Sequence, residues 1–189
     1  WRIEAKRLVT TLRHRGIEDE AVLWAMSRVP RHAFIPPNLC AHSYEDTALP
    51  IGSEQTISQP YVVARMTEAL TEGVSLRNVL EVGTGCGYQT TVLAPLVAQV
   101  FSIERVLPIL QRTQERLTQL AVSNVRLRHG DGFGGWKAYA PYEGIIVAAA
   151  PVAVPEALVQ QLSPRGGRLV IPVGPEGAQE LLRITRKDD

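Results

Sequence analysis

The sequence predicts a doubly wound α/β domain, in which parallel strands alternate with helices. Two observations lead to this prediction. From residue 73 onward, short runs rich in β-branched residues alternate with stretches of helical periodicity, which is typical of βαβ units. The first of these runs ends in a glycine-rich turn at residues 83–87 that leads directly into a helical stretch. In open α/β sheets such turns lie at the carboxyl edge, where ligands bind.

The first 72 residues predict helices and a proline-rich segment. Apolar residues recur at helical spacing from Ile3 to Leu12. A second helix is expected from Asp19 to Arg28, because the residue before Pro30 avoids the helical region. Residues 30–60 combine several prolines with little periodicity, so we expect a structureless binding segment laid over the fold. The last helix of this part is expected at residues 60–72, with a proline in its first turn.

The remaining elements alternate as a parallel sheet requires. The expected strands are 78–82, 99–103, 125–129, 144–147, 168–173 and 179–185, and the expected helices are 88–96, 108–121 and 154–162. A length of 189 residues suits one hydrophobic core. We therefore expect a single domain of residues 1–189, with residues 1–72 as N-terminal helices and substrate-binding segment and residues 73–189 as the cofactor-binding α/β core.

Composition argues against several classes of function. Twenty Lys and Arg are scattered among nineteen Asp and Glu, giving a net charge of +1 and no basic face for nucleic acid. No apolar run approaches the roughly 18 residues that a bilayer span needs, and no basic and apolar leader is seen. The cysteines Cys40 and Cys86 are too few for a disulfide framework, and the histidines lack metal-ligand spacing. We expect a cytoplasmic protein with no metal, no nucleic-acid partner and no membrane contact.

Three positions at successive strand ends predict a nucleoside site. The turn has the spacing Gly-x-Gly-x-Gly rather than that of a dinucleotide fingerprint. Glu104 ends the second strand, where an acid can accept both ribose hydroxyls, and Asp131 follows the third, beside Gly132, where it can read an adenine amino group. Taken singly, the turn could be purely structural and each acid could be solvated or turn-forming. Because the turn and the two acids each follow one of three successive strands, together they indicate nucleoside binding.

Narrower motifs resemble a known family. They are VPRHAF at 29–34, LPIG at 49–52, QTISQP at 55–60, GCGYQT at 85–90, and IIV at 145–147 running to Pro151. With these motifs the chain resembles the protein-L-isoaspartate (D-aspartate) O-methyltransferases over nearly its whole length. The QTISQP segment is the most discriminating, because it lies outside the cofactor fold that such methyltransferases share. The resemblance implies a Rossmann-like class I methyltransferase sheet that binds S-adenosyl-L-methionine and releases S-adenosyl-L-homocysteine.

The resemblance also implies roles for single residues. It places Ser58 at the reaction centre, with Thr56 and Ile57 beside it lining the cofactor and substrate site. The cofactor's methionine part would face Gly83, Gly85 and Gly87, and Thr84 of the same turn is a further cofactor-binding residue. The cofactor's ribose would face Glu104 and its adenine Asp131 with Gly132, while Gln179 aligns less securely with a C-terminal contact. From the residues alone, Ser58 could also be a helix N-cap. Arg31 and His32 are expected to be packing and surface residues, and Cys86 a small filler of the turn.

The implied activity is methylation of the α-carboxylate of L-isoaspartyl residues in damaged proteins and peptides, giving an ester that reverts through a succinimide. The resemblance also implies that the enzyme is a monomer. The alternatives are a class I methyltransferase with another acceptor, an NAD-dependent dehydrogenase, and an inactive S-adenosylmethionine-binding module. Three departures from the family pattern stand out: Glu143 replaces a common Asp, Ala148 replaces a usual Thr, and the family's final antiparallel strand would lie beyond Asp189.

Overall fold

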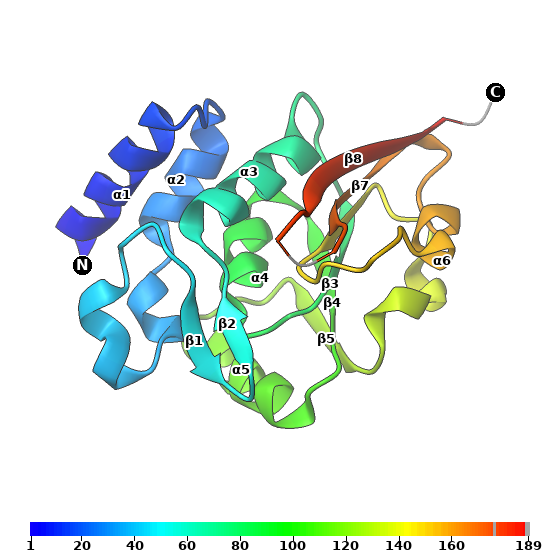
Figure 1. Cartoon of the computed structure of the whole chain (residues 1–189). Coiled ribbons are helices and arrows are strands. Elements are labelled where there is room, and N and C mark those ends of the chain that lie inside the picture. Colours follow the sequence, from blue (N-terminus) through cyan, green and yellow to red (C-terminus); the bar gives the residue numbers. More distant parts are fainter. Residues whose placement is uncertain (176, 188–189) are drawn as a thin grey trace.

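The computed structural model describes residues 1–175 and 177–187 (Figure 1). Its larger sheet has the strand order β5-β4-β3-β6-β7-β8, and every neighbouring pair is parallel except β7 and β8. The strands are β3 (Asn78–Val82), β4 (Gln99–Glu104), β5 (Val125–His129), β6 (Gly144–Val147), β7 (Arg165–Val173) and β8 (Glu180–Lys187). The chain runs outward from β3 to β5 and then returns to β6, so a topological switch point lies between β3 and β6. The predicted doubly wound α/β fold is confirmed.

Helices cover both faces of this sheet. They are α1 (Arg2–His14), α2 (Glu20–Arg28), α3 (Pro60–Thr71), α4 (Tyr88–Leu93), α5 (Leu107–Gln119) and α6 (Glu156–Gln160), with 3₁₀ turns η1 (Arg31–Phe34), η2 (Pro37–His42), η3 (Ala94–Leu96), η4 (Gly132–Gly134) and η5 (Lys137–Tyr139). On β3, Val79 packs in the cluster that contains α3 and α4 side chains, whereas Leu80 and Val82 pack in the one that contains α6. The central strands are therefore buried on both faces, which explains why they read as nearly continuous apolar runs.

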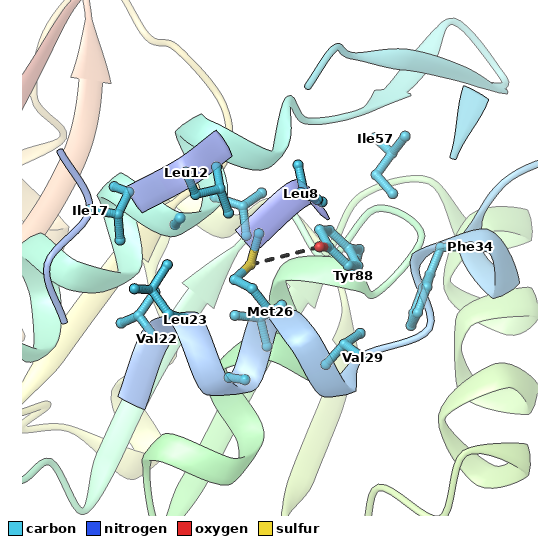
Figure 2. Close-up of a cluster of buried hydrophobic side chains, with 14 of the residues drawn as sticks. Leu8, Leu12, Ile17, Val22, Leu23, Met26, Val29, Phe34, Ile57 and Tyr88 are labelled. Atoms are coloured by element: carbon cyan, nitrogen blue, oxygen red, sulfur yellow. Dashed lines mark hydrogen bonds between the residues drawn. The ribbon is translucent and has the colours of Figure 1, made fainter. Parts of the chain in front are cut away.

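An apolar cluster joins α1 and α2 to the rest of the domain (Figure 2). Leu12 from α1 and Met26 from α2 meet Ile57 and Tyr88 in this cluster, and the Tyr88 hydroxyl donates to Met26 Sδ at 3.7 Å. Tyr88 is the first residue of α4, directly after the glycine turn, and Ile57 immediately precedes Ser58. One core thus anchors both the turn and the segment that carries Ser58.

The expectation of a structureless segment at residues 30–60 was wrong. Besides η1 and η2, this segment forms an antiparallel hairpin of β1 (Leu49–Gly52) and β2 (Gln55–Ile57). Leu49 and Ile57 pair across the hairpin and are both buried, so the hairpin is fixed by packing against the core. Its turn residues, Ser53 and Glu54, both have positive φ without being glycine.

Smaller differences concern element ends. The helix expected at 154–162 is shorter, because Pro155 precedes α6 and the backbone leaves the helix at Gln161. The helix expected at 88–96 divides into α4 and η3, with Pro95 at the start of the 3₁₀ turn. Within the described residues, β8 pairs with β7 alone, and no helix there is long and apolar enough to cross a membrane. The division into residues 1–72 and 73–189 stays a prediction.

Candidate functional site

The glycine turn lies at the switch point, between β3 and α4. The backbone N–H groups of Gly83 and Thr84 donate to the carbonyl of Ile103 on the neighbouring strand, at 2.9 and 3.2 Å. Gly87 is the N-cap of α4 and has a φ of +86°, a conformation that side chains other than glycine rarely adopt. The turn therefore keeps its backbone open towards the carboxyl edge of the sheet, where open α/β folds bind ligands.

Glu104 holds this turn from the next strand. Its side chain is buried, with Oε2 accepting the N–H of Gly85 at 2.9 Å and Oε1 accepting the N–H of Val106 at 2.9 Å. The alternative of a merely solvated strand-end residue is therefore wrong. The carboxylate is fixed between the glycine turn and the chain that leads into α5, with further lone pairs left to accept hydroxyl groups of a ligand.

A second buried acid lies beneath the turn and was missed by the sequence reasoning. Glu81 is completely buried, and its Oε2 accepts the hydroxyls of Thr90 and Ser102, each at 2.5 Å. Ser102 also contacts Thr84 Oγ1 at 2.6 Å, whereas Glu81 Oε1 has no hydrogen-bond partner among the described residues. Burial, and to a lesser extent the charge of Glu104, raises the pKa of Glu81 to about 7 against the two hydroxyl bonds.

A small cavity brings the turn and the segment around Ser58 together. It is lined by Thr56, Ile57, Ser58, Val63, Gly83, Thr84, Gly85, Cys86, Tyr88, Gln89 and Ala148. Six predicted site residues, from Thr56 to Ser58 and from Gly83 to Gly85, thus meet although a whole helix separates them in sequence. Within the described chain, the Ser58 hydroxyl has no hydrogen-bond partner and Gln59 is the N-cap of α3. The N-cap alternative for Ser58 is therefore wrong.

The other predicted residues lie outside this cavity. Asp131 is exposed at the end of β5, where its Oδ1 accepts the N–H of Phe133 at 3.0 Å. The turn-forming alternative for Asp131 is thus realised, and Oδ2 is left without a partner in the described part of the chain. A Cβ at Gly132 would lie 2.4 Å from Val82 Cγ1, so this position has no room for a side chain. Gln179 is exposed in the connection between β7 and β8 and lines no part of the cavity.

The cavity lining explains which residues sequence reasoning overlooked. Tyr88 and Gln89 directly follow the glycine turn and could have been included on that ground, whereas Val63 on α3 reaches the cavity only through tertiary packing. Cys86 was expected to be a filler, and burial raises the pKa of its thiol to about 11, which keeps it protonated and a poor nucleophile. A more open hollow of about 810 Å³ lies at the opposite edge of the sheet, where β3 and β7 begin, away from all of these groups.

The geometry fits a nucleoside cofactor with a methionine part. Going outward along the carboxyl edge, the chain offers an uncharged cradle at Gly83, the carboxylate of Glu104 on β4 and the free Oδ2 of Asp131 after β5. A Cβ at Gly83 would lie 3.5 Å from the Ala148 Cβ and would fill this cradle. No group of three or more His, Cys, Asp or Glu side chains within residues 1–175 and 177–187 is placed to hold a metal ion.

The fold and this site define a class I, S-adenosylmethionine-dependent methyltransferase. The family model described as Protein-L-isoaspartate(D-aspartate) O-methyltransferase matches residues 3–189. The chain belongs to the protein-L-isoaspartate (D-aspartate) O-methyltransferase family.

Relatives and solved structures agree with this assignment. A Halorhodospira halophila protein named protein-L-isoaspartate O-methyltransferase is 58% identical over 183 residues, covering 97% of this chain and 83% of the relative. A Nitrosococcus oceani protein of the same name, with the number 1 added, is 54% identical over 187 residues, covering 98% and 87%. A structure named protein-L-isoaspartate O-methyltransferase superposes with a TM-score of 0.85 at 27% identity, covering 97% of this chain and 60% of that one. A Plasmodium falciparum structure in complex with S-adenosyl-L-homocysteine gives 0.79 at 27% identity, covering 97% and 90%.

Proposed function

We propose that this enzyme transfers the methyl group of S-adenosyl-L-methionine to the α-carboxylate of L-isoaspartyl residues in damaged proteins and peptides. The observation that carries the proposal is the single cavity in which Ser58 meets the glycine turn at Gly83 and Gly85. Donor and acceptor sites of a methyl transfer must be adjacent, because the carboxylate oxygen has to approach the methyl carbon in line at about 3 Å.

The lining of the cavity suits an acceptor that is already an anion. Within the described residues, none of the side chains that line it is acidic, basic or an imidazole. A carboxylate with an ordinary pKa near 4 is ionised at neutral pH and needs no general base. An amine or hydroxyl acceptor would have to lose a proton, and the cavity offers no group that could take it. The chain's contribution is therefore to orient the acceptor and to exclude water.

We assign the orienting role to Ser58. Its unpartnered hydroxyl is free to donate a hydrogen bond to one oxygen of the substrate carboxylate, which directs the other oxygen towards the methyl group. Thr56 and Ile57 form the wall beside it. Bound S-adenosylmethionine supplies a sulfonium methyl group, so that a C–O bond forms as the C–S bond breaks and S-adenosyl-L-homocysteine is left. The neighbouring backbone nitrogen attacks the methyl ester far more readily than it attacks a carboxylate, because methanol can leave. The succinimide that forms is opened by water, which returns part of the residues to aspartate.

The cofactor would be held by the residues of the carboxyl edge. We propose Gly83, Thr84, Gly85 and Gly87 at its methionine part, Glu104 at its ribose hydroxyls, and Asp131 with Gly132 at its adenine. Gln179 remains the least supported of these contacts, because it lies in the connection between β7 and β8. The uncharged cradle, the buried carboxylate and the free Asp131 oxygen support this order along the edge.

We further propose that the enzyme is a cytoplasmic monomer whose partners are isoaspartyl proteins and peptides. Cys40 and Cys86 are free thiols, which suits a reducing compartment. The near-neutral net charge of +1 offers no attraction to nucleic acid.

The test is transfer of radiolabelled methyl from S-adenosylmethionine to a synthetic L-isoaspartyl peptide, with the matching aspartyl peptide as control. The expected result is base-labile label on the isoaspartyl peptide alone. Label on both peptides would point to another acceptor. Tight S-adenosylhomocysteine binding without label on either peptide would make the chain an inactive cofactor-binding module, and binding of NAD instead would contradict the methyltransferase assignment.

A further inference from the structure

Arg31, which was expected to be a packing or surface residue, is completely buried. Its guanidinium donates to three backbone carbonyls, those of Ser43 at 2.7 Å, Thr47 at 3.0 Å and Ser58 at 3.0 Å. Ser43 follows η2, Thr47 precedes β1, and Ser58 follows β2. One side chain therefore ties both ends of the hairpin together and fixes the backbone of Ser58 from the side of the core.

The same guanidinium reaches the other side of the cavity. Its Cζ lies 5.5 Å from the centroid of the Tyr88 ring, and Tyr88 lines the cavity directly after the glycine turn. In Figure 2 the ring of Tyr88 lies near Ile57, the neighbour of Ser58. Arg31 thus contacts Ser58, at the proposed acceptor site, and Tyr88, on the side of the cavity where the glycine turn lies.

The charge of Arg31 has no ion-pair partner in the described chain. The nearest carboxylate that influences it, Asp46, is paired with Arg15 and acts on Arg31 only from beyond ion-pair distance, and the buried Nε of Arg31 has no hydrogen-bond partner. Burial is the main influence on its pKa, which it lowers. A buried charge without a counter-ion is costly. The three carbonyl hydrogen bonds offset part of that cost, and an anion in the cavity would offset more.

An incoming substrate carboxylate supplies the missing anion. The proposed acceptor must leave water and enter a cavity whose own side chains carry no charge. Desolvating a carboxylate is unfavourable unless a cation or donors replace its water. We propose that Arg31 is a positioning residue that holds Ser58 in place and whose buried charge favours the substrate carboxylate over an uncharged group in the cavity. This inference rests on the proposed function.

The test compares two peptides that differ only in charge at the reacting group. One carries the L-isoaspartyl α-carboxylate, and the other carries an α-carboxamide there and cannot be methylated in the same way. Calorimetry with S-adenosylhomocysteine bound gives the ratio of their dissociation constants. For the unaltered enzyme we expect the carboxylate to bind about tenfold tighter or more, as an opposite charge nearby at an effective dielectric constant near 20 would produce.

The informative variants are Arg31→Gln and Arg31→Met, which remove the charge, and Arg31→Lys, which keeps it. We expect the ratio to fall to about threefold or less in the two neutral variants and to persist in Arg31→Lys, while S-adenosylhomocysteine affinity changes little. Arg31→Gln keeps donors for some of the three carbonyls, and Arg31→Met, which fills the space without donors, provides a second neutral variant. Equal weakening of both peptides, with the ratio unchanged, would show a merely structural role and overturn the inference.

Two further variants serve as controls. Arg168 also donates to backbone carbonyls, those of Leu70 and Glu72, but at the edge of the sheet where β6 begins, opposite the edge with the cavity, so Arg168→Gln should leave the ratio unchanged. Arg116, unlike Arg31, is hydrogen-bonded to the glycine turn itself, at the carbonyl of Cys86. Loss of the ratio in Arg116→Gln but not in Arg31→Gln would overturn the inference. Failure of the unaltered enzyme to methylate the carboxylate peptide would instead contradict the proposed function.

Discussion

Gly87 and Thr113 approach so closely that a Cβ on residue 87 would lie 2.7 Å from Thr113 Cγ2. The Thr113 hydroxyl meanwhile donates to the carbonyl of Gly85 at 2.7 Å. Helix α5 therefore supports the glycine turn from below with one side chain, whose hydroxyl holds the backbone and whose methyl group requires a glycine.

The first prediction concerns Gly87→Ala. We expect a loss of at least ~1–2 kcal/mol in the free energy of unfolding from the left-handed φ alone, with an added cost from the contact to Thr113, and weaker S-adenosylhomocysteine binding. Thr113→Ser removes Cγ2 but keeps the hydroxyl, so the double variant should recover the part due to the contact. Chemical unfolding and calorimetry measure both effects.

Gly73→Ala is the matched control, because Gly73 has a φ of +69° but open space around it. It should lose only the conformational part of the stability and none of the cofactor affinity. A double variant Gly87→Ala/Thr113→Ser as unstable as the single Gly87→Ala would contradict the steric explanation.

The second prediction concerns Ser58→Ala. A hydrogen bond to a charged group contributes ~1.5–3 kcal/mol, so kcat/KM for an isoaspartyl peptide should fall roughly ten- to hundredfold. The Ser58 hydroxyl has no partner in the described chain, so the thermal midpoint and the affinity for S-adenosylhomocysteine should stay unchanged. Ser75→Ala, in the exposed turn before β3, should keep full activity. Unaltered methylation kinetics in Ser58→Ala would remove Ser58 from the site.

The third prediction concerns Glu104→Gln. An amide has one acceptor oxygen, so one of the N–H groups of Gly85 and Val106 would face an NH₂ group and lose its partner. The expected cost is about 1–3 kcal/mol in stability, with weaker S-adenosylhomocysteine binding measured by calorimetry.

Glu68 provides a matched control for Glu104. It is also buried, with Oε1 accepting the backbone N–H groups of Glu18 and Asp19 and Oε2 paired with Arg65 at 2.9 Å. Glu68→Gln loses this ion pair and places an NH₂ group against either the guanidinium or the two N–H groups, so it should lose stability while cofactor affinity is retained. Equal loss of affinity in both variants would mean that Glu104 acts only through stability.

The success of the sequence predictions follows from the kind of information each element carries. The strands at 125–129 and 144–147 were predicted with their observed bounds, because β-rich runs between turn residues are local signals. The hairpin was missed because Ser53 and Glu54 take positive φ values, whereas turns of this kind are usually marked by Asn or Gly. Its strands are held by burial against the core, and no local pattern records that.

The residues of the candidate site also differ in whether a local sequence pattern predicts them. The glycine turn and Glu104 could be predicted because each follows a strand whose end is readable from the sequence. The burial of Arg31 could not, because its partners are backbone carbonyls, which carry no sequence signal, and their positions depend on the missed hairpin. Glu81 was likewise missed, since an acid within an apolar strand shows its partners only when α4 and β4 are packed against it.

The last prediction concerns Glu81 and pH. Its pKa in the folded protein is raised from an ordinary 4.5 to about 7, chiefly by burial. Between these values the folded state binds more protons than the unfolded state, so the free energy of unfolding should fall as pH rises through this window, by up to about 3 kcal/mol, and level off above it. Glu81→Gln stays neutral, so urea unfolding at pH 5 and pH 8 should show the variant gaining on the unaltered enzyme by that amount at the higher pH. Thr90→Val removes one hydroxyl that favours the ionised form and should raise the upper limit of the window while its lower limit stays. A stability difference between Glu81→Gln and the unaltered enzyme that is the same at both pH values would mean that Glu81 does not titrate in this range.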